Sequence, residues 1–328
     1  MKLLVIRFSS IGDIVLTTPV VRCLKKQLPD TEVHFLTKES YRSILEANPY
    51  VDKIITLGLS KTLMMHQLKT EQYDYIIDLH HNLRTWEVKR ALKGVPAYSF
   101  HKLNWQKWLM TVFKINRLPS DHIVDRYMST ASSLGVVNDG GGLDYFIPSH
   151  AKISATDIPF SHRMGYITLV IGAAHATKQL PVHRCIELCQ KISFPILLLG
   201  GRADQARGEA IAAHDPIKIY NACGKFSLHE SADLVRQSRL VITPDTGLMH
   251  IAAAFKKPII SIWGNTIPAF GMTPYYGSSK VAHEESVVQL GCRPCSKIGY
   301  DACPKKHFKC MENQNLGQIQ QWVEQMMH

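Results

Sequence analysis

A carboxylate follows the first apolar run of the chain at a position suited to catalysis. Leu3–Ile6 predicts a buried strand, and Gly12-Asp13 comes shortly after it, where the pattern predicts a tight turn and a helix start. Open parallel sheets bind ligands outside the carboxyl ends of their strands, so Asp13 is a candidate general base. A carboxylate at a helix start is also favoured by the helix dipole, so a simple capping role stays open.

A second strand-to-helix junction offers complementary chemistry. The apolar run before Pro244 predicts a strand, and Asp245-Thr246-Gly247 opens the next helix. Free amides at a helix start hold anions, and Gly247 lets a diphosphate approach the backbone closely. His250 lies one helical turn further on, where it either faces the same ligand or is a satisfied histidine on a half-buried helix.

Two further loops after predicted strands add weaker signals for phosphate binding. The run from Gly172 to Pro181 holds small residues with Thr177 and Lys178, yet it matches neither the Walker A nor the GxGxxG pattern. Gly200-Gly201 follows the next strand and predicts a turn with close backbone approach. No Asp-x-Asp pair occurs in the chain, so no local carboxylate clamp recruits a nucleotide-bound metal, and we expect metal-independent chemistry.

Half of the eight cysteines form a cluster near the C-terminus. Their spacing is Cys292-x2-Cys295-x7-Cys303-x6-Cys310, with His307 close by. In a chain expected to be cytoplasmic, such clustering favours structural zinc over disulfides. The spacing is irregular for a zinc finger, so reduced thiols or a partly disulfide-linked subdomain stay open as alternatives. The remaining cysteines lie in apolar contexts that predict buried thiols: Cys23, Cys185, Cys189 and Cys223.

A basic stretch between Arg84 and Arg117 carries three of the five tryptophans, Trp86, Trp105 and Trp108. Eight Lys or Arg residues stand there against one acid, Glu87, in a chain of formal net charge +11. Such a stretch suits nucleic acid, an anionic membrane surface or an anionic glycolipid. We expect it to form one surface of the N-terminal half, and the residues alone do not choose among these anionic partners. A solvated helix face whose Trp side chains pack inward is the alternative.

Short apolar runs alternate with helical patterns along most of the chain, which is typical of parallel sheets covered on both faces. The predicted strands are Leu3–Phe8, Val33–Thr37, Lys53–Leu57, Tyr75–Leu79, Tyr166–Ile171, Pro195–Gly200, Ile217–Tyr220, Leu240–Thr243 and Pro258–Trp263. The turn-rich stretch from Asn138 to Arg163 predicts the linker. We therefore expect an α/β protein of two doubly wound domains, residues 1–155 and 156–328, around a cleft. An amphipathic helix through Leu316 and Val323 would end the chain.

The composition is that of a soluble globular protein, with 45% hydrophobic and 20% charged residues in 328. This length is long for one core and comfortable for two domains. The N-terminal apolar run is too short for a signal peptide, and no other stretch reaches membrane length without a charge, so we expect a cytoplasmic protein. No nucleic-acid-binding motif occurs, and the basic stretch lies away from the cysteines, which argues against a nucleic-acid partner.

Four groups of residues together resemble the lipopolysaccharide heptosyltransferases of glycosyltransferase family 9, which have the GT-B fold of two Rossmann-like domains. The groups are Arg7-x-Ser9-Ser10-Ile11-Gly12-Asp13, Asp78-Leu79-His80-x-x-Leu83-Arg84, Asn221-x-x-Gly224-Lys225-x-Ser227-Leu228, and Pro244-Asp245-Thr246-Gly247-Leu248-x-His250 with Trp263-Gly264-x-Thr266. The pattern Cys303-Pro304-x-x-His307-x-x-Cys310 is also similar to that of several members. The similarity spans nearly the whole chain.

The resemblance implies an inverting transfer of heptose from ADP-heptose to the inner core of lipopolysaccharide, on an acceptor of the Kdo–lipid A type. Asp13 would be the general base. The donor would meet Thr177, Lys178, Gly200, Gly201, Lys225, Ser227, Asp245, Thr246, Gly247 and His250. The acceptor, an anionic glycolipid, would meet Ser10, Gly12, His80, Arg84, Lys102 and Lys107. Catalysis would need no cofactor, and the enzyme would be peripheral at the inner face of the cytoplasmic membrane.

The predicted phosphate loop departs from the family pattern. Members usually show Lys-Arg-Trp-Pro, where this chain has Lys178-Gln179-Leu180-Pro181, and neither Ala173 nor Ala174 offers a hydroxyl. The difference bears on the donor sugar more than on the nucleotide diphosphate. A related transferase that uses another nucleotide sugar, or a sugar-nucleotide epimerase or hydrolase on the same fold, is therefore the alternative.

Overall fold

The computed structural model describes residues 1–58 and 60–327, which divide into two compact units with one parallel sheet each. The first unit comprises Met1–Lys102, Asp121–Phe146 and Tyr275–Ser279; the second comprises Leu103–Ser120, Ile147–Pro274 and Lys280–His328. The predicted pair of α/β domains is confirmed. The units do not follow the single boundary expected after residue 155, because Leu103–Ser120 groups with the second unit and Tyr275–Ser279 with the first.

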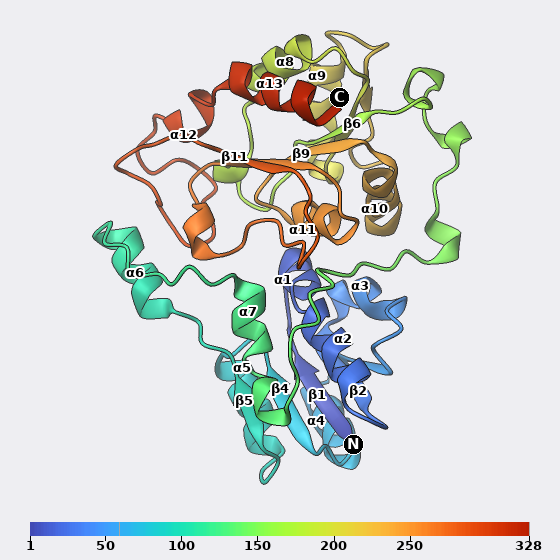
Figure 1. Ribbon diagram of the computed structural model, residues 1–328, viewed down its shortest axis with the longest axis vertical. Coiled ribbons are helices and arrows are strands. Elements are labelled where there is room, and N and C mark those ends of the chain that lie inside the picture. The colour runs from blue at the N-terminus through green and yellow to red at the C-terminus, as the bar shows by residue number, and fades with distance from the viewer. Residues whose placement is uncertain (59, 328) are drawn as a thin grey trace. The chain divides into compact units, whose positions relative to one another are not determined.

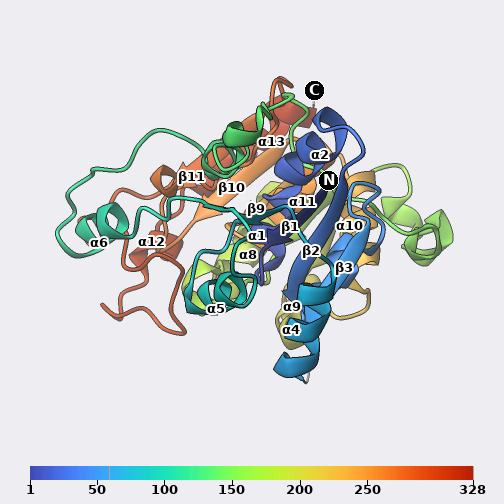
Figure 2. The same ribbon diagram turned by 90° about the horizontal axis from the view of Figure 1, so that it is seen from below.

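The sheet of the first unit has parallel strands in the order β3-β2-β1-β4-β5. The strands are β1 (Lys2–Ile6), β2 (Glu32–Lys38), β3 (Lys53–Leu57), β4 (Tyr75–Asp78) and β5 (Ala97–Ser99). Figure 2 shows β1, β2 and β3 side by side. Strand β1 is almost wholly apolar and buried, because helices cover both faces of a parallel sheet.

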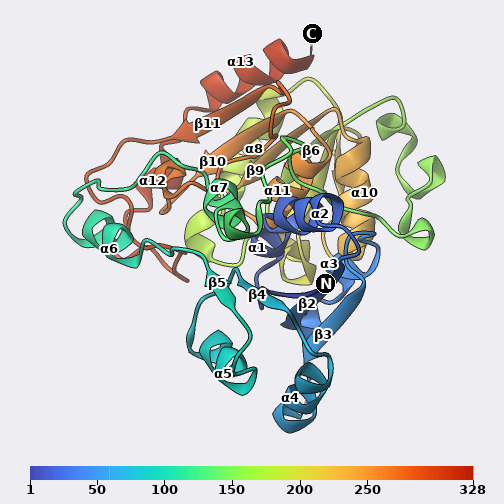
Figure 3. The same cartoon turned by 60° about the horizontal axis from the view of Figure 1, so that its bottom comes forward.

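Helices of the first unit cover both faces of its sheet. They are α1 (Ile11–Val15), α2 (Thr18–Gln27), α3 (Ser43–Glu46), α4 (Lys61–Thr70), α5 (Leu83–Ala91) and α7 (Ile123–Met128). Figure 3 shows α2 and α7 on one side of the strands and α4 and α5 on the other. Leu68 of α4 and Val88 of α5 pack with Leu4 and Ile76 of the sheet into one buried core. Burial of each such side chain contributes about 1.5–3 kcal/mol.

The sheet of the second unit has parallel strands in the order β11-β10-β9-β6-β7-β8. The strands are β6 (Ile167–Val170), β7 (Ile196–Leu199), β8 (Ile219–Asn221), β9 (Leu240–Pro244), β10 (Ile259–Trp263) and β11 (His283–Val287). The strand order reverses between β6 and β9, as it does between β1 and β4 in the first sheet. In open α/β sheets, ligands bind outside the carboxyl ends of the strands at such switch points.

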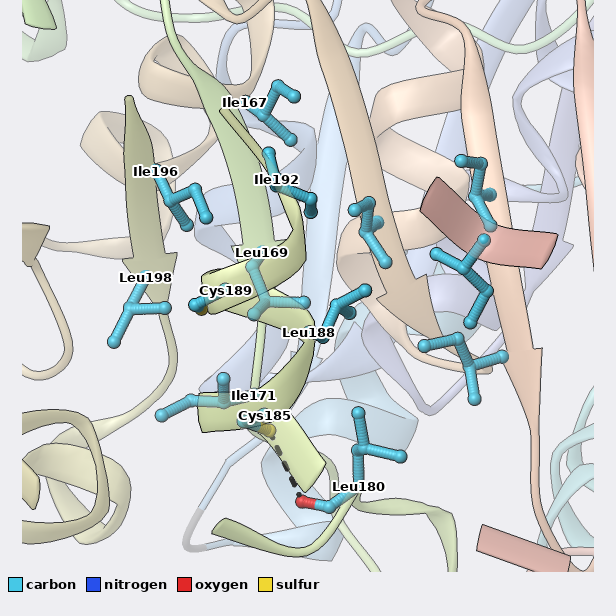
Figure 4. Packing of buried hydrophobic residues seen from close by; sticks show 14 of the residues in the cluster. Ile167, Leu169, Ile171, Leu180, Cys185, Leu188, Cys189, Ile192, Ile196 and Leu198 are labelled. Carbon is cyan, nitrogen blue, oxygen red and sulfur yellow. Dashed lines mark hydrogen bonds between the residues drawn. The ribbon is translucent and has the colours of Figure 1, made fainter. Parts of the chain in front are cut away.

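Helices also cover both faces of the second sheet. The helices of the second unit are α6 (Asn104–Val112), α8 (Val182–Lys191), α9 (Gln205–Ala212), α10 (Leu228–Gln237), α11 (Gly247–Ala254), α12 (Lys309–Glu312) and α13 (Leu316–Met327), of which α6 has no buried residue. Figure 1 shows α8, α9 and α13 on one face of this sheet and α10 and α11 on the other. The C-terminal helix was predicted, and its Ile319 and Val323 are buried in the core that Figure 4 shows around Leu169 and Leu188.

The predicted linker contains short 3-10 turns rather than a long helix, namely η3 (Ser149–Ala151), η4 (Ala155–Asp157) and η5 (Phe160–His162). Among the described residues, no helix combines the length and the apolar character that crossing a membrane requires.

Candidate functional site

Asp13 lies in the first turn of α1, directly after β1, at the switch point of the first sheet. Its Oδ1 is 2.6 Å from Nη2 of Arg7. Its Oδ2 accepts hydrogen bonds from the backbone amide and the hydroxyl of Ser10, at 3.0 and 2.8 Å. The capping contact considered from the sequence is therefore present. The carboxylate nevertheless stays accessible, because its side chain is 20% exposed.

Arg7 organises this end of the sheet. Its Nη1 donates to the backbone oxygen of Leu79 at 2.6 Å and to the hydroxyl of Tyr127 at 2.8 Å. Leu79 follows β4 and Tyr127 belongs to α7, so one buried guanidinium ties three elements together and fixes Asp13. The sequence motif contained Arg7, but no local pattern links β1 to β4 or α7, and this role was missed.

Opposing effects set the pKa of Asp13. Burial alone would raise the pKa, whereas the charge of Arg7 and the hydrogen bonds from Ser10 lower it, and the net result lies below the ordinary value for an aspartate. The carboxylate is therefore ionised at neutral pH. A general base must begin the reaction in this protonation state.

His80 follows β4 at the same switch point, and its ring packs against Phe8 with the centroids 4.9 Å apart. Burial, together with the charges of Arg7 and Lys102, lowers the pKa of His80 to about 4, so the imidazole is neutral at pH 7. Its Nδ1 is buried without a hydrogen-bond partner among residues 1–58 and 60–327. Buried polar groups are normally paired, so this nitrogen is suited to bind a substrate hydroxyl.

The remaining acceptor candidates lie on different elements. Gly12 is buried within α1, Arg84 is exposed on α5, and Lys102 is half-buried after β5. Lys107 lies on α6, in the segment that groups with the second unit, with its ammonium 5.8 Å from the ring centroid of Phe270. The basic stretch is therefore divided between the two units, which corrects the expectation of one surface on the N-terminal half.

The tryptophans of the basic stretch do not pack inward, so that alternative is wrong. Trp86, Trp105 and Trp108 are 54%, 64% and 39% exposed. Trp105 stacks on Trp108 with the ring centroids 4.9 Å apart. Helix α6 has no buried residue, and its aromatic side chains are left facing solvent.

Lys178 and Asp245 meet at the switch point of the second sheet. Lys178 ends the 3-10 turn η6 (Ala176–Lys178) after β6, Asp245 follows β9, and Nζ is 2.6 Å from Oδ2. The hydroxyl of Thr266, which follows β10, donates to the same carboxylate oxygen at 3.0 Å. The lysine and aspartate side chains are 15% and 12% exposed. Asp245 therefore orients Lys178 and offsets part of its charge.

Helix α11 begins immediately after this ion pair. Its N-cap Thr246 makes no side-chain capping hydrogen bond, and the Thr246 hydroxyl instead pairs with that of Thr243 at 3.2 Å. First-turn amides that no side chain caps are the donors that bind phosphate at helix starts. Gly247 opens the helix, and His250 in the next turn is only 2% exposed, more buried than the sequence suggested. The structure thus brings Lys178, Asp245, Thr246 and Gly247 together.

The glycines after β7 are already in contact with a side chain. A Cβ at Gly200 would lie 2.8 Å from Cβ of Asp204, and the amide of Gly201 donates to Oδ2 of Asp204 at 3.0 Å. The close approach predicted at these glycines is therefore made by Asp204.

Lys225 and Ser227 follow β8, the strand at the edge of the sheet. Ser227 caps α10, since its amide donates to Oε2 of Glu230 at 2.7 Å and its hydroxyl accepts from the amide of Glu230 at 3.3 Å. The ammonium of the exposed Lys225 lies 4.6 Å from the ring centroid of Tyr220. The structure places these two residues at the edge of the sheet and not at its switch point.

The hydroxyl of Thr177 is used within the protein. Thr177 is 2% exposed, and its Oγ1 accepts from the amide of Tyr300 at 2.8 Å and donates to Oδ1 of Asn265 at 3.1 Å. Thr177 therefore fixes loops next to Lys178. Tyr300 and Asn265 lie outside the predicted phosphate loop, and so does Thr266, which binds Asp245. Of these three residues, only Thr266 was named in a motif of the family resemblance.

The clustered cysteines lie in the long loop before α12 and at its start. All four are free thiols, and Sγ of Cys292 is 3.8 Å from Nε2 of His307. Within the described ranges, the one group of three or more ligand atoms that all lie within 4.8 Å of one another is Glu32, His34 and Glu71. The cysteine sulfur atoms are thus spread more widely, and zinc there stays a prediction. The predicted buried thiols, Cys23, Cys185, Cys189 and Cys223, are confirmed.

Comparison with known proteins assigns the chain to a family. The sequence profile of glycosyltransferase family 9 (heptosyltransferase) matches residues 62–304. The chain belongs to this family. Lipooligosaccharide heptosyltransferase 2 of Haemophilus ducreyi is 26% identical over 301 residues, which cover 82% of this chain and 85% of the relative. Lipopolysaccharide heptosyltransferase 2 of Salmonella typhimurium is 23% identical over 323 residues, or 88% of each chain.

Solved structures agree with this assignment at the level of the fold. The family 9 glycosyltransferase of Veillonella parvula has a TM-score of 0.75 at 22% identity, covering 99% of this chain and 96% of its own. The ADP-heptose lipopolysaccharide heptosyltransferase II of Escherichia coli has a TM-score of 0.75 at 19% identity, with coverage of 99% and 98%. The heptosyltransferase described here has the predicted GT-B fold. By family it is a glycosyltransferase of lipopolysaccharide biosynthesis.

Proposed function

We propose that this heptosyltransferase moves heptose from ADP-heptose to the inner core of lipopolysaccharide, on an acceptor of the Kdo–lipid A type, with inversion at the anomeric carbon. The observation that carries the donor assignment is the Lys178–Asp245 pair beside the uncapped start of α11. A shielded lysine next to free helix amides suits a diphosphate. ADP-heptose is also the donor in the name of the Escherichia coli relative.

Asp13 is the proposed general base. An acceptor hydroxyl is a poor nucleophile, so it must lose its proton as its oxygen attacks the anomeric carbon. The proton passes to the Asp13 carboxylate, the new C–O bond forms, and the bond to the diphosphate breaks with its electron pair leaving on ADP. Arg7 keeps Asp13 ionised and oriented, and Nδ1 of His80 accepts a hydrogen bond from an acceptor hydroxyl. A single displacement by this route inverts the configuration.

Negative charge develops on ADP as it leaves. Lys178 and the first-turn amides of α11 stabilise this charge, and their effect is large because the lysine is shielded from water. The sequence supplies no Asp-x-Asp pair to hold a nucleotide-bound metal, so the proposed reaction needs neither metal nor cofactor. Zinc, if bound at the cysteines, would have a structural role.

An anionic glycolipid at the inner face of the cytoplasmic membrane is the proposed acceptor. Support comes from α6 and its C-cap residue, since Trp105 of the helix is 64% exposed and Phe113 at the C-cap is 56% exposed. Lys107 and Lys114 lie close to these aromatic residues in the sequence, and residues 103–120 contain no acid. Exposed aromatic side chains among basic residues are typical of surfaces that bind anionic membranes. The enzyme is thus proposed to be cytoplasmic and peripheral to the inner membrane, docked through α6.

Turnover of ADP-heptose with a panel of Kdo–lipid A acceptors tests the proposal. We expect release of ADP, a mass gain of one heptose on the acceptor and an inverted anomeric proton signal by NMR. Consumption of ADP-heptose without a glycosylated acceptor would instead identify an epimerase or hydrolase. Transfer from a different nucleotide sugar would keep the fold and the reaction but replace the donor.

A further inference from the structure

The segment that carries the clustered cysteines makes contacts that the proposed chemistry leaves unexplained. Residues 288–308 form neither helix nor strand. Loops of this length without secondary structure are uncommon in compact domains and usually have a function. Because backbone polar groups need partners, the places where this segment binds the rest of the unit indicate what it does. We call residues 291–310 the four-cysteine segment.

One set of contacts attaches the four-cysteine segment to the loop after β6. The amide of Thr177 donates to the carbonyl oxygen of Tyr300 at 3.1 Å, and the amide of Tyr300 donates to Oγ1 of Thr177 at 2.8 Å. Gly299 has φ +139°, and a Cβ there would lie 2.5 Å from Cβ of His175. The segment therefore packs closely on the backbone that leads into Lys178.

A second set attaches the segment to the loop after β10. The amide of Cys295 donates to the carbonyl oxygen of Asn265 at 3.0 Å, and Nη2 of Arg293 donates to that of Thr266 at 2.7 Å. Arg293 is 6% exposed, so this hydrogen bond is shielded from water. Thr266 in turn donates its hydroxyl proton to Asp245 at 3.0 Å. Arg293 thus holds the residue that orients the partner of Lys178.

We propose that the four-cysteine segment is a strap that positions the donor-binding loops, with Gly299 and Arg293 as its positioning residues. The inference rests on the donor site proposed above at Lys178 and Asp245. Neither positioning residue binds the donor. Both act by fixing loops from two different strands before ADP arrives, which reduces the ordering cost of binding. Any change that loosens the strap, including one at its cysteines, should therefore weaken ADP binding.

A pair of glycine variants tests the strap. Gly299→Ala adds a methyl group that must displace the segment from His175. Gly291→Ala adds the same group where, apart from Gly291 and its two chain neighbours, no heavy atom of the described residues lies within 4 Å. By isothermal titration we expect Gly299→Ala to weaken ADP binding by about 10-fold or more, because small displacements of positioning groups are costly. Gly291→Ala should bind ADP like the unaltered protein. The donor KM should rise more than kcat falls.

Two variants of Arg293 give an independent test of the strap in case Gly299→Ala does not fold. Arg293→Met removes the hydrogen bond to Thr266, and Arg293→Lys should restore part of the ADP affinity by keeping one donor. The control is Arg184→Met, because Arg184 also donates to a backbone oxygen, that of Gln314, at 2.6 Å. Melting temperatures of the two Met variants show how much each loses in general stability.

The outcomes separate the strap from the donor site. Weaker ADP binding in Gly299→Ala and Arg293→Met, beyond that in their controls, supports the strap. If the unaltered protein binds ADP, and Gly299→Ala and Arg293→Met bind it as well as their controls do, the strap is wrong and the donor site stands. Equal loss of affinity in Arg293→Met and Arg184→Met also overturns the strap. If the unaltered protein binds no ADP, the donor assignment fails and the strap fails with it.

Discussion

Arg7 and Asp13 form a 2.6 Å ion pair across the turn after β1, and Lys178 and Asp245 form one of the same length between the loops after β6 and β9. The two ion pairs leave opposite charges available to a ligand. In the first, the arginine is buried and the carboxylate is the more exposed partner. In the second, the aspartate orients a lysine that would meet phosphate. Each switch point thus presents the charge that its proposed substrate requires.

Replacing Asp13 by asparagine should abolish most turnover and leave donor binding intact. The change removes the base but keeps a group that can accept hydrogen bonds from Ser10. We expect kcat to fall by about 100-fold or more, as for other general bases. ADP affinity, measured by calorimetry, should stay unchanged. Asp30→Asn is the matched control, since Asp30 is exposed in the same unit and its φ of 49° suits asparagine. Near-normal turnover in Asp13→Asn would reduce Asp13 to a helix cap.

Lys178→Met should weaken ADP binding by about 10-fold or more, equivalent to about 1.4 kcal/mol. The variant removes the charge proposed to face the diphosphate while keeping much of the side-chain volume. Lys191→Met, an exposed lysine at the end of α8, is the control. Turnover should also survive EDTA. Complete loss of activity on chelation, restored by magnesium, would show that a metal carries the phosphate charge instead.

The acidic limb of the pH profile should report Asp13. Its pKa lies below the ordinary 3.8, whereas His80 is protonated near pH 4, so kcat/KM should hold steady on acidification to about pH 4 and fall below it. Ser10→Ala removes a hydrogen bond to the carboxylate, so the limb should move to higher pH, and Arg7→Met should move it further. His80 gains its proton near pH 4, so its protonation also contributes to the acidic limb. Ser10→Ala should not shift this contribution of His80. If neither substitution shifts the acidic limb, the limb reports the titration of a side chain other than Asp13.

The same pKa shift predicts the pH dependence of stability. A folded-state pKa below the unfolded one means that ionised Asp13 stabilises the fold at neutral pH. This contribution to the free energy of unfolding is lost as pH falls through the folded-state pKa. Urea unfolding between pH 3 and 6 should show a smaller pH dependence in Asp13→Asn than in the unaltered protein. Identical slopes would mean that folding causes no net shift in the pKa of Asp13.

Structural zinc is expected on Cys292, Cys295, Cys303 and Cys310, at about one ion per chain, because clustered cysteines favour it in the cytoplasm, where this protein is proposed to act. Protein purified without added zinc should contain the metal by elemental analysis, and Cys303→Ser should lower its content. Cys23→Ser, at a buried thiol of the other unit, should not. Four titratable thiols without metal, or disulfides, would replace the zinc prediction. A zinc whose removal spares folding but abolishes chemistry would contradict its structural role.

Helix α6 should set the affinity for the glycolipid acceptor. Charge attraction to anionic headgroups contributes about 1 kcal/mol per basic residue near the surface and is screened by salt. Raising salt, or replacing Lys107 and Lys114 together by serine, should therefore raise the acceptor KM more than the donor KM. Binding to vesicles of anionic lipid should weaken in parallel. The control replaces Lys152 and Lys191, both exposed in the same unit. Unchanged vesicle binding and acceptor KM would place the acceptor elsewhere.

Local patterns in the sequence were enough to find the inner strands and the two junctions. Strands such as β1 and β9 read as apolar runs because they are buried on both faces. The unpredicted strands β5 and β11 lie at sheet edges, and His283–Val287 of β11 is largely polar. An edge strand has one neighbour and less cover, so its composition need not be apolar. Asp13 and Asp245 were identified because strand ends and helix starts are local properties.

Only the tertiary structure decided which candidate groups are available to a substrate. Thr177 and Tyr300 are 123 residues apart in the chain, yet their hydrogen bonds use the hydroxyl that the sequence assigned to the donor. Lys178 and Asp245 are 67 residues apart and meet because β6 pairs with β9. Strand order is a property of the whole sheet, and buried polar groups take partners from whichever segments the fold brings near. The sequence determined the family and the candidate residues, and the fold determined their partners.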